Sequence, residues 1–193
     1  MIAEARVECR SLAQALENVL QFVPMAGQHA LVLLRLEPRS AVVVLGGSAH
    51  VTVADTAQTE QGWQPVECLL DRASAQALAT HVREGIDRTA RLTFSASSVR
   101  VEAGEQEPMN VPITTDDGTM GRRATELKAA QARAGGSPRA VRIDPMTWSS
   151  LGRVEAAGHR IARLQSVEGR RSLAVRIGAT FQGVIMPLKI VTH

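Results

Sequence analysis

The sequence predicts an α+β fold made of tandem β-α-β-β-β units, with the helices packed on one face of antiparallel sheets. Three stretches of the chain carry this prediction, and they begin at Val7, Val66 and Val141. Each opens with a short strand in which apolar and polar residues alternate. The strand leads directly into apolar residues at helical spacing. The repetition of one pattern indicates a unit that is used three times.

The ends of the second and third stretches also match. The second closes with Val111-Pro112-Ile113 and the third with Met186-Pro187-Leu188. Val66 and Val141 are 75 positions apart, and so are Pro112 and Pro187. The two stretches therefore correspond at both ends.

The first unit opens with a strand over residues 5–9. Ser11 is the expected N-cap of the following helix, because a serine hydroxyl can accept from a free amide of the first turn. Pro24 and Gly27 should end this helix. We expect strands over residues 29–37, 40–45 and 50–55. Gly46-Gly47-Ser48 fits a hairpin turn better than a phosphate-binding loop.

The second unit covers residues 64–113, with Asp71 as the candidate helix N-cap. Strands are expected over residues 91–95, 99–103 and 109–113. Cys9 and Cys68 lie at matching places in the first two units, where a strand residue points inward. We expect both to be buried free thiols rather than a disulfide.

The third unit starts at residue 139, and Asp144-Pro145 should cap its helix. We expect Met146, Leu151 and Val154 to point inward and Trp148 to do so in part. Strands are expected over residues 161–167, 172–177 and 181–190.

The predicted domains are a two-unit domain over residues 1–113, a linker over 114–138 and a half-domain over 139–193. Residues 122–133 are polar with high helix propensity, which indicates a short solvated helix that acts as a spacer. The half-domain needs a partner for the edge of its sheet, because an open edge invites pairing. That partner could be the linker or another subunit.

The composition is typical of a globular protein, with 45% apolar and 21% charged residues. The sequence has no apolar run of the roughly 20 residues that a membrane span needs, and its start does not resemble a signal peptide. We therefore expect a cytoplasmic location and no membrane partner. Residues 1–120 have a net charge of −6 and residues 121–193 one of +9. This asymmetry indicates either an electrostatic binding surface or attraction between subunits.

The sequence favours no catalytic, metal or cofactor site. Its five histidines are scattered, without a pair or a cysteine at metal-ligand spacing. Nucleotide-binding and nucleophile-elbow motifs are missing. Asp116-Asp117 fits a solvated loop better than a catalytic carboxylate pair. With no Tyr, three Phe and two Trp, the chain is also poor in the aromatic platforms that bind single strands.

The tandem units, the helix pattern Leu12, Ala15, Leu16, Val19 and the ending 184–190, Val-Ile-Met-Pro-Leu-Lys-Ile, resemble the bacterial DNA sliding clamp, the beta subunit of DNA polymerase III. Residues 1–113 resemble one complete clamp domain. The third unit resembles the second half of that family's last domain. Members of the family have about twice this length, with three domains of two units each.

The resemblance implies a non-enzymatic, sliding-clamp-like replication accessory (processivity) factor, a homo-oligomer that tethers a polymerase or repair partner to duplex DNA without sequence specificity. The alternatives are a clamp-fold interaction module that does not encircle DNA and, less favoured, an enzyme with an unrecognised site. The implied DNA contacts are Arg83, Arg153, Arg160, Gln14 and Asn18.

The family's groove for short hydrophobic peptides implies binding residues at Val184, Met186, Pro187 and Leu188. Methionine adapts to related peptides, and a proline suits the edge of a sheet. The same residues could instead form a closing strand that fills the core.

Overall fold

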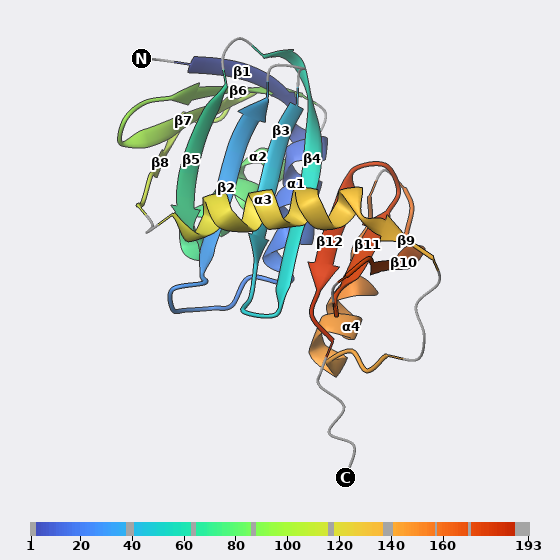
Figure 1. The fold of residues 1–193 in the computed structure, drawn as a ribbon. Coiled ribbons are helices and arrows are strands. Elements are labelled where there is room, and N and C mark those ends of the chain that lie inside the picture. Colours follow the sequence, from blue (N-terminus) through green and yellow to red (C-terminus); the bar gives the residue numbers. More distant parts are fainter. Residues whose placement is uncertain are drawn as a thin grey trace.

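The computed structural model describes residues 3–37, 41–62, 65–85, 88–115, 118–136, 141–156, 158–169 and 171–187. This part of the chain contains four helices and twelve strands, and the strands form one continuous antiparallel sheet system (Figure 1). The α+β class expected from the sequence is confirmed.

The first unit has the expected order of elements. They are β1 (Ala3–Glu8), α1 (Cys9–Leu20), β2 (Leu31–Glu37), β3 (Ala41–Gly47) and β4 (Val51–Gly62). The helix begins before Ser11, and Glu8 precedes it without a side-chain cap. The Ser11 hydroxyl instead accepts from the Gln58 amide at 3.3 Å. The prediction of Ser11 as N-cap is therefore wrong, because the strand passes into the helix earlier than the cap rule implied.

The hairpin turn predicted at Gly46-Gly47-Ser48 is confirmed. The Ser48 amide donates to the Val51 carbonyl oxygen at 2.9 Å. Gly47 has a φ of +150°, and a Cβ at this position would lie 2.0 Å from the same oxygen. Glycine is needed here because the backbone closes too tightly for a side chain.

The second unit repeats the first. Its elements are β5 (Val66–Asp71), α2 (Arg72–Glu84), β6 (Thr89–Phe94), β7 (Ser98–Ala103) and β8 (Met109–Pro112). Asp71 caps α2 as predicted, since its Oδ1 accepts from the Ser74 amide at 2.7 Å. Cys9 and Cys68 are buried and free, as expected.

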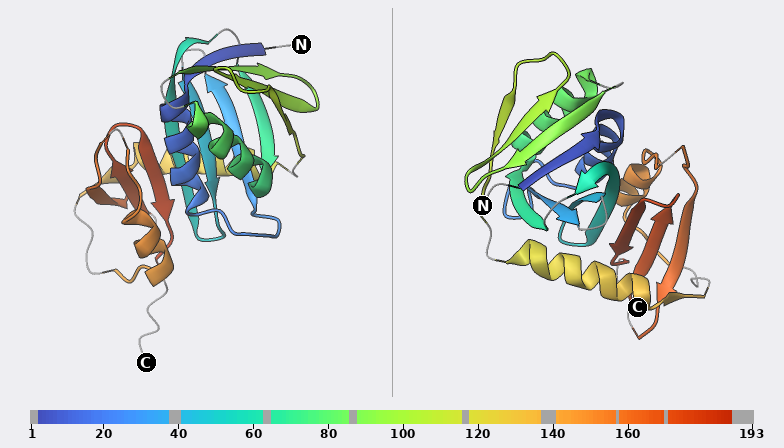
Figure 2. Two further views of the ribbon diagram at one scale, coloured as in Figure 1. Left: turned by 180° about the vertical axis from the view of Figure 1, so that it is seen from behind. Right: turned by 90° about the horizontal axis from the view of Figure 1, so that it is seen from above.

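The two units join reciprocally. The first strand of each pairs with the second strand of the other, β1 with β6 and β5 with β2, over six residue pairs in each case. The helices α1 and α2 pack beside each other under the sheets (Figure 2). One apolar core includes residues of both units. Each unit thus supplies the neighbouring strand and helix that the other needs to enclose its core.

The third unit is less regular. Its elements are α4 (Pro145–Leu151), β10 (Ala162–Val167), β11 (Leu173–Ile177) and β12 (Phe181–Ile185). Asp144 caps α4 as predicted, with its Oδ2 2.8 Å from the Thr147 amide. Leu151 and Val154 are buried as expected. The last strand was expected to reach residue 190; β12 ends at Ile185, and residues 188–190 lie outside the described part.

Two expectations for the third unit are wrong. Residues 141–143 do not form a strand, because within the described part of the chain no strand pairs with them. Met146, expected to point inward, is 75% exposed, since it lies on the side of α4 that faces away from the sheet. Trp148, expected to point inward only in part, is 56% exposed.

The third unit attaches to the first through its last strand. The strand β12 pairs with β4, with Ile185 opposite Val51 and Gln182 opposite Ala54. The sheet therefore continues from one unit into the other. The helices α1, α2 and α4 all lie on one side of it (Figure 2). They are anchored as expected by Leu16, Leu78 and Leu151, which are at most 4% exposed.

The linker region packs on the opposite side of the sheet. Helix α3 (Thr119–Ala132) crosses β2, β3, β4 and β12, and β9 (Ala134–Gly135) pairs with the end of β10 (Figure 1). The helix buries Met120, Leu127 and Ala130. Gln131 donates from Nε2 to the Gly183 carbonyl oxygen at 2.8 Å. The expected solvated spacer is thus a packed helix, because the apolar outer face of the sheet offers it a surface.

The two outermost strands of the third unit each pair with a strand from outside the unit. The linker strand β9 pairs with β10, as one of the two alternatives foresaw, while β12 pairs with the first unit. The domain boundaries at residues 113 and 139 stay a prediction.

Candidate DNA and partner interface

The helix side of the sheet is the candidate surface for DNA, because most of the residues expected to contact DNA lie on the unit helices or directly after them. A groove of about 720 Å³ runs between α4 and the ends of α1 and α2. Apolar and polar residues line it, including the acids Glu17 and Asp144. It also contains three arginines, Arg72, Arg83 and Arg153. These arginines differ in whether their guanidinium groups already bind another group of the protein.

Arg83, in the last turn of α2, forms an ion pair with the Glu17 carboxylate on α1. Arg72 donates from Nη1 to the Leu20 carbonyl oxygen at 2.7 Å, so that its charge satisfies the carboxyl end of α1. Arg153 is exposed, and among the described residues no carboxylate forms an ion pair with it. Arg153 is thus the arginine of the groove that is most available to an anion.

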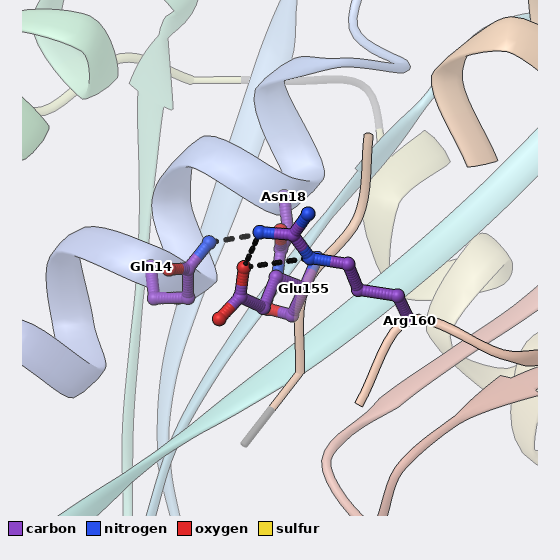
Figure 3. Close-up of polar contacts among 4 residues, drawn as sticks. All are labelled: Gln14, Asn18, Glu155 and Arg160. Atoms are coloured by element: carbon purple, nitrogen blue, oxygen red, sulfur yellow. Dashed lines mark hydrogen bonds and ion pairs between the residues drawn. The ribbon is translucent and has the colours of Figure 1, made fainter. Parts of the chain in front are cut away.

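Arg160 lies beyond α4 and faces a carboxylate of its own unit. Its Nε and Nη2 approach Glu155 Oε2 at 3.0 and 2.5 Å (Figure 3). Its side chain remains 74% exposed. An exposed pair of this kind is weak, so a phosphate can compete for the guanidinium.

Asn18 is buried and connects the first unit with the third. Although it was expected on the polar face of α1, it is 2% exposed, under the joint between the first and third units. Its Nδ2 donates to Asp55 Oδ2 at 2.6 Å and to the Glu155 carbonyl oxygen at 2.7 Å. Its Oδ1 accepts from the Glu155 amide and from Gln14 Nε2, both at 3.2 Å (Figure 3). This side chain is enclosed, and we do not retain it as a DNA contact.

Asp55 on β4 is the buried acid of this joint and is also 2% exposed. Burial raises the pKa of its carboxyl, and hydrogen bonds from Asn18, Thr180 and the Thr56 amide oppose the rise. A carboxyl group so enclosed can hold the two units together, but it is poorly placed to meet a phosphate.

The C-terminal residues expected to bind a peptide differ in how far they are exposed. Val184 on β12 is partly buried and packs against the apolar clusters under α3. Met186 is 53% exposed, and its amide donates to the His50 carbonyl oxygen at 2.8 Å. Pro187 is half-buried, and Leu188 lies outside the described residues. Val184 thus packs partly against the core, whereas the side chain of Met186 is exposed.

Other kinds of site find little support in the described residues. They contain no group of three or more His, Cys, Asp and Glu side chains that could hold a metal ion. None of their helices is long and apolar enough to span a membrane.

Several solved structures with the same arrangement are sliding clamps. The C. crescentus beta sliding clamp matches with a TM-score of 0.69 and 14% sequence identity, over 100% of this chain and 66% of its own. The chain has the bacterial sliding-clamp fold. It spans slightly less than two thirds of this clamp, as of several others. No protein-family model matches the sequence, and no curated protein matches it.

Two further sliding clamps were solved with bound ligands. The Helicobacter pylori beta clamp, bound to a DNA ligase peptide, matches with a TM-score of 0.70 and 5% identity, over 98% of this chain and 68% of its own. The Pseudomonas aeruginosa clamp, DNA polymerase III subunit beta, bound to griselimycin, matches with a TM-score of 0.68 and 12% identity, over 99% and 66%. At these identities the similarity shows the clamp fold alone.

Sequence reasoning missed the residues that join the first and third units. Asn18 was assigned by helical periodicity to the solvent side, although it lies three positions after Ala15, which is also buried. Asp55 was an ordinary strand residue in the sequence. The only signal was an acid within residues 51–57, which are otherwise Val, Ala and Thr, and it became meaningful once β12 was found beside β4.

Proposed function

We propose that the protein is a sliding-clamp-like DNA replication accessory factor. It acts in the cytoplasm as a homo-oligomer, holds duplex DNA by its backbone and tethers a polymerase or repair partner. It does this without catalysis. One observation carries the proposal: three unit helices lie on one side of a continuous sheet, in a fold that it shares with sliding clamps.

The proposed DNA contacts are Arg153, Arg83 and Arg160, together with Gln14, which lies near Arg160 (Figure 3). Phosphate contacts of this kind position a duplex without reading its sequence. Arg153 should contribute most, because Glu17 and Glu155 compete with the phosphates for the other two arginines. The net charge of +9 on residues 121–193 adds a longer-range attraction.

Charge reversal at Arg153 tests the DNA contact. Arg153→Glu should weaken binding to a long duplex and reduce the salt slope of log K by about 1 or more, as expected for each lost phosphate contact. Arg100→Glu is the matched control. Arg100 is exposed between the buried Val99 and Val101 of β7, so it points away from the helices. Fluorescence anisotropy over a salt series gives both quantities. Equal losses in the two variants would contradict a specific helix-side contact.

The proposed partner surface contains Met186 and Pro187, together with Leu188. The support is the exposure of Met186 and the DNA ligase peptide bound by the H. pylori clamp. Met186→Ala combined with Pro187→Ala should lower the affinity for such a peptide and leave the melting temperature unchanged. Met25→Ala, which changes another exposed methionine, is the control. Unchanged peptide affinity in the folded double variant would end this part of the proposal.

The second candidate is a clamp-fold interaction module that binds protein partners only. The pairing of Arg83 with Glu17 and of Arg160 with Glu155 favours it, because both pairs reduce the positive potential of the helix side. If the parent protein fails to bind duplex DNA at low salt, this candidate replaces the first.

A further inference from the structure

The third unit leaves open the two surfaces through which the first two units join. In the two-unit domain, the first strand of each unit pairs with the second strand of the other. In the third unit the corresponding segments are residues 141–143 and β10. Residues 141–143 form no strand, and among the described residues only Ala134 and Gly135 pair with the outer edge of β10.

The free part of the β10 edge is residues 162–165, since β9 pairs only with Ser166 and Val167. This part is long enough to receive the three residues 141–143. Apolar side chains flank both segments. Val141 is 40% exposed and Ile161 is 83% exposed. An unpaired strand edge with apolar side chains beside it is a site for the addition of another strand.

One flank of α4 is open as well. The repeat aligns Trp148-Ser149-Ser150-Leu151 with Ala13-Gln14-Ala15-Leu16 and Ala75-Gln76-Ala77-Leu78. The position of Trp148 is thus an alanine in α1 and α2, and both alanines are at most 4% exposed.

Helical geometry assigns that position to the flank where unit helices meet. At 100° per residue, Ala13 lies about 60° from the sheet-facing Leu16, and Glu17 lies about 100° from it on the same side. Glu17 forms the ion pair with Arg83 of α2, so this flank faces the partner helix. Ser150 points the other way and donates to the Gln21 carbonyl oxygen of the first unit at 3.1 Å. Trp148 therefore lies on the flank of α4 that has no helix of the described residues beside it.

We propose that two copies of this chain dimerise through their third units. Residues 141–143 of one copy pair with β10 of the other, and the reciprocal pair forms by symmetry. The two α4 helices face each other along their Trp148 flanks. The two half-domains then make one complete two-unit domain with a twofold axis at its centre, so that the contact closes and does not propagate. Tryptophan in place of alanine keeps these helices further apart than α1 and α2 and supplies its own apolar area.

The charge of the joint is compatible with this pairing. The proposed pairing brings Arg142 of one copy close to Arg163 on β10 of the other. Like charges opposite each other weaken a sheet. The two-unit domain already contains such a pair, since Arg6 on β1 lies opposite Arg91 on β6. The dimer should consequently tighten as salt rises. Duplex binding should weaken under the same change. The dimer does not depend on the proposed DNA function, and either can fail alone.

Sedimentation equilibrium of the full chain without DNA tests the dimer. The parent should reach twice the chain mass of 20.7 kDa. Trp148→Glu should weaken association at least tenfold, whereas Met25→Glu, at an 82% exposed methionine outside the third unit, should leave it unchanged. Circular dichroism verifies that each variant folds. A parent of 20.7 kDa at 100 µM, or a dimer unaffected by Trp148→Glu, would overturn the proposal.

Disulfide trapping between differently marked chains tests the strand pairing. Arg142→Cys and Arg163→Cys are placed in separate chains, which are mixed and mildly oxidised. The native thiols give a low background, because both are buried and burial raises the pKa of Cys68 to about 12. The mixed disulfide should form readily from this mixture and not when Arg100→Cys replaces Arg142→Cys. Equal yields from both mixtures would refute the pairing.

Discussion

The first two units and the third are built to the same plan but differ in how fully they are enclosed. Helix α1 buries eight of its 12 residues, whereas α4 buries only Leu151 among seven. One apolar core runs through all three units, but among the described residues only the two residues of β9 pair with the outer edge of the third unit. The comparison indicates that a β-α-β-β-β unit is completed by the unit beside it.

The joint with the first unit partly makes up for this difference. Phe22 and Phe181 lie across it with ring centroids 5.9 Å apart. Asn18 binds the backbone of Glu155 at both its amide and its carbonyl group. The third unit should therefore depend on this joint more strongly than the first two units depend on it.

The largest expected effect comes from core leucines. Leu16→Ala and Leu78→Ala should each lower the free energy of unfolding by about 2–5 kcal/mol, as buried large-to-small changes do. Leu151→Ala should fall at the lower end of this range, because α4 has an open flank onto which the site can relax. Chemical denaturation measures the three values. A loss below about 1 kcal/mol at all three would show that these helices are not anchored as described.

The next effect concerns the joint itself. Asn18→Ala removes the buried amide that connects Asp55 with Glu155, at a cost of about 1–3 kcal/mol for each group left unpaired. Hydrogen exchange should become faster in β11 and β12 and stay unchanged in β6 and β7. Gln14→Ala, which removes the neighbouring and more exposed amide, is the control. Uniform acceleration throughout the sheet would mean that the joint does not open separately.

A smaller, pH-dependent effect is expected at Asp55. Its folded-state pKa is raised, so its contribution to stability is complete below the unfolded pKa of about 3.9 and is lost as pH rises through the folded pKa. Asp55→Asn lacks this dependence. The stability of the variant relative to the parent should thus increase with pH from about 4 upward. Thermal melts of both proteins over that range measure the difference, and a difference that decreases with pH would reverse the sign assigned to burial.

The smallest effect separates a true helix cap from an apparent one. Asp71→Ala should cost about 1 kcal/mol, because it removes the oxygen that accepts from the Ser74 amide. Ser11→Ala should cost only a few tenths of that, since Ser11 lies inside α1. Similar losses in both variants would indicate that Ser11 stabilises the helix after all.

The sequence by itself determined the features that depend on neighbouring residues. The alternation around Val7 and Val66 predicted strands, and the caps at Asp71 and Asp144 followed from side chains that reach amides three residues away. The glycine turn before Val51 and the burial of Cys9 and Cys68 were predictable for the same reason. All of these depend on local backbone geometry and on the two-residue period of a strand.

Only the tertiary structure decided which surfaces meet. A polar helix over residues 119–132 buries one of its sides because an apolar sheet face lies under it. Asn18 becomes a joint residue because Glu155, 137 positions away, is carried beside it. Residues 141–143 have a strand pattern but form no strand, since a strand needs a partner for its backbone hydrogen bonds. Periodicity shows which residues turn inward, whereas the identity of the neighbour depends on pairings between distant parts of the chain.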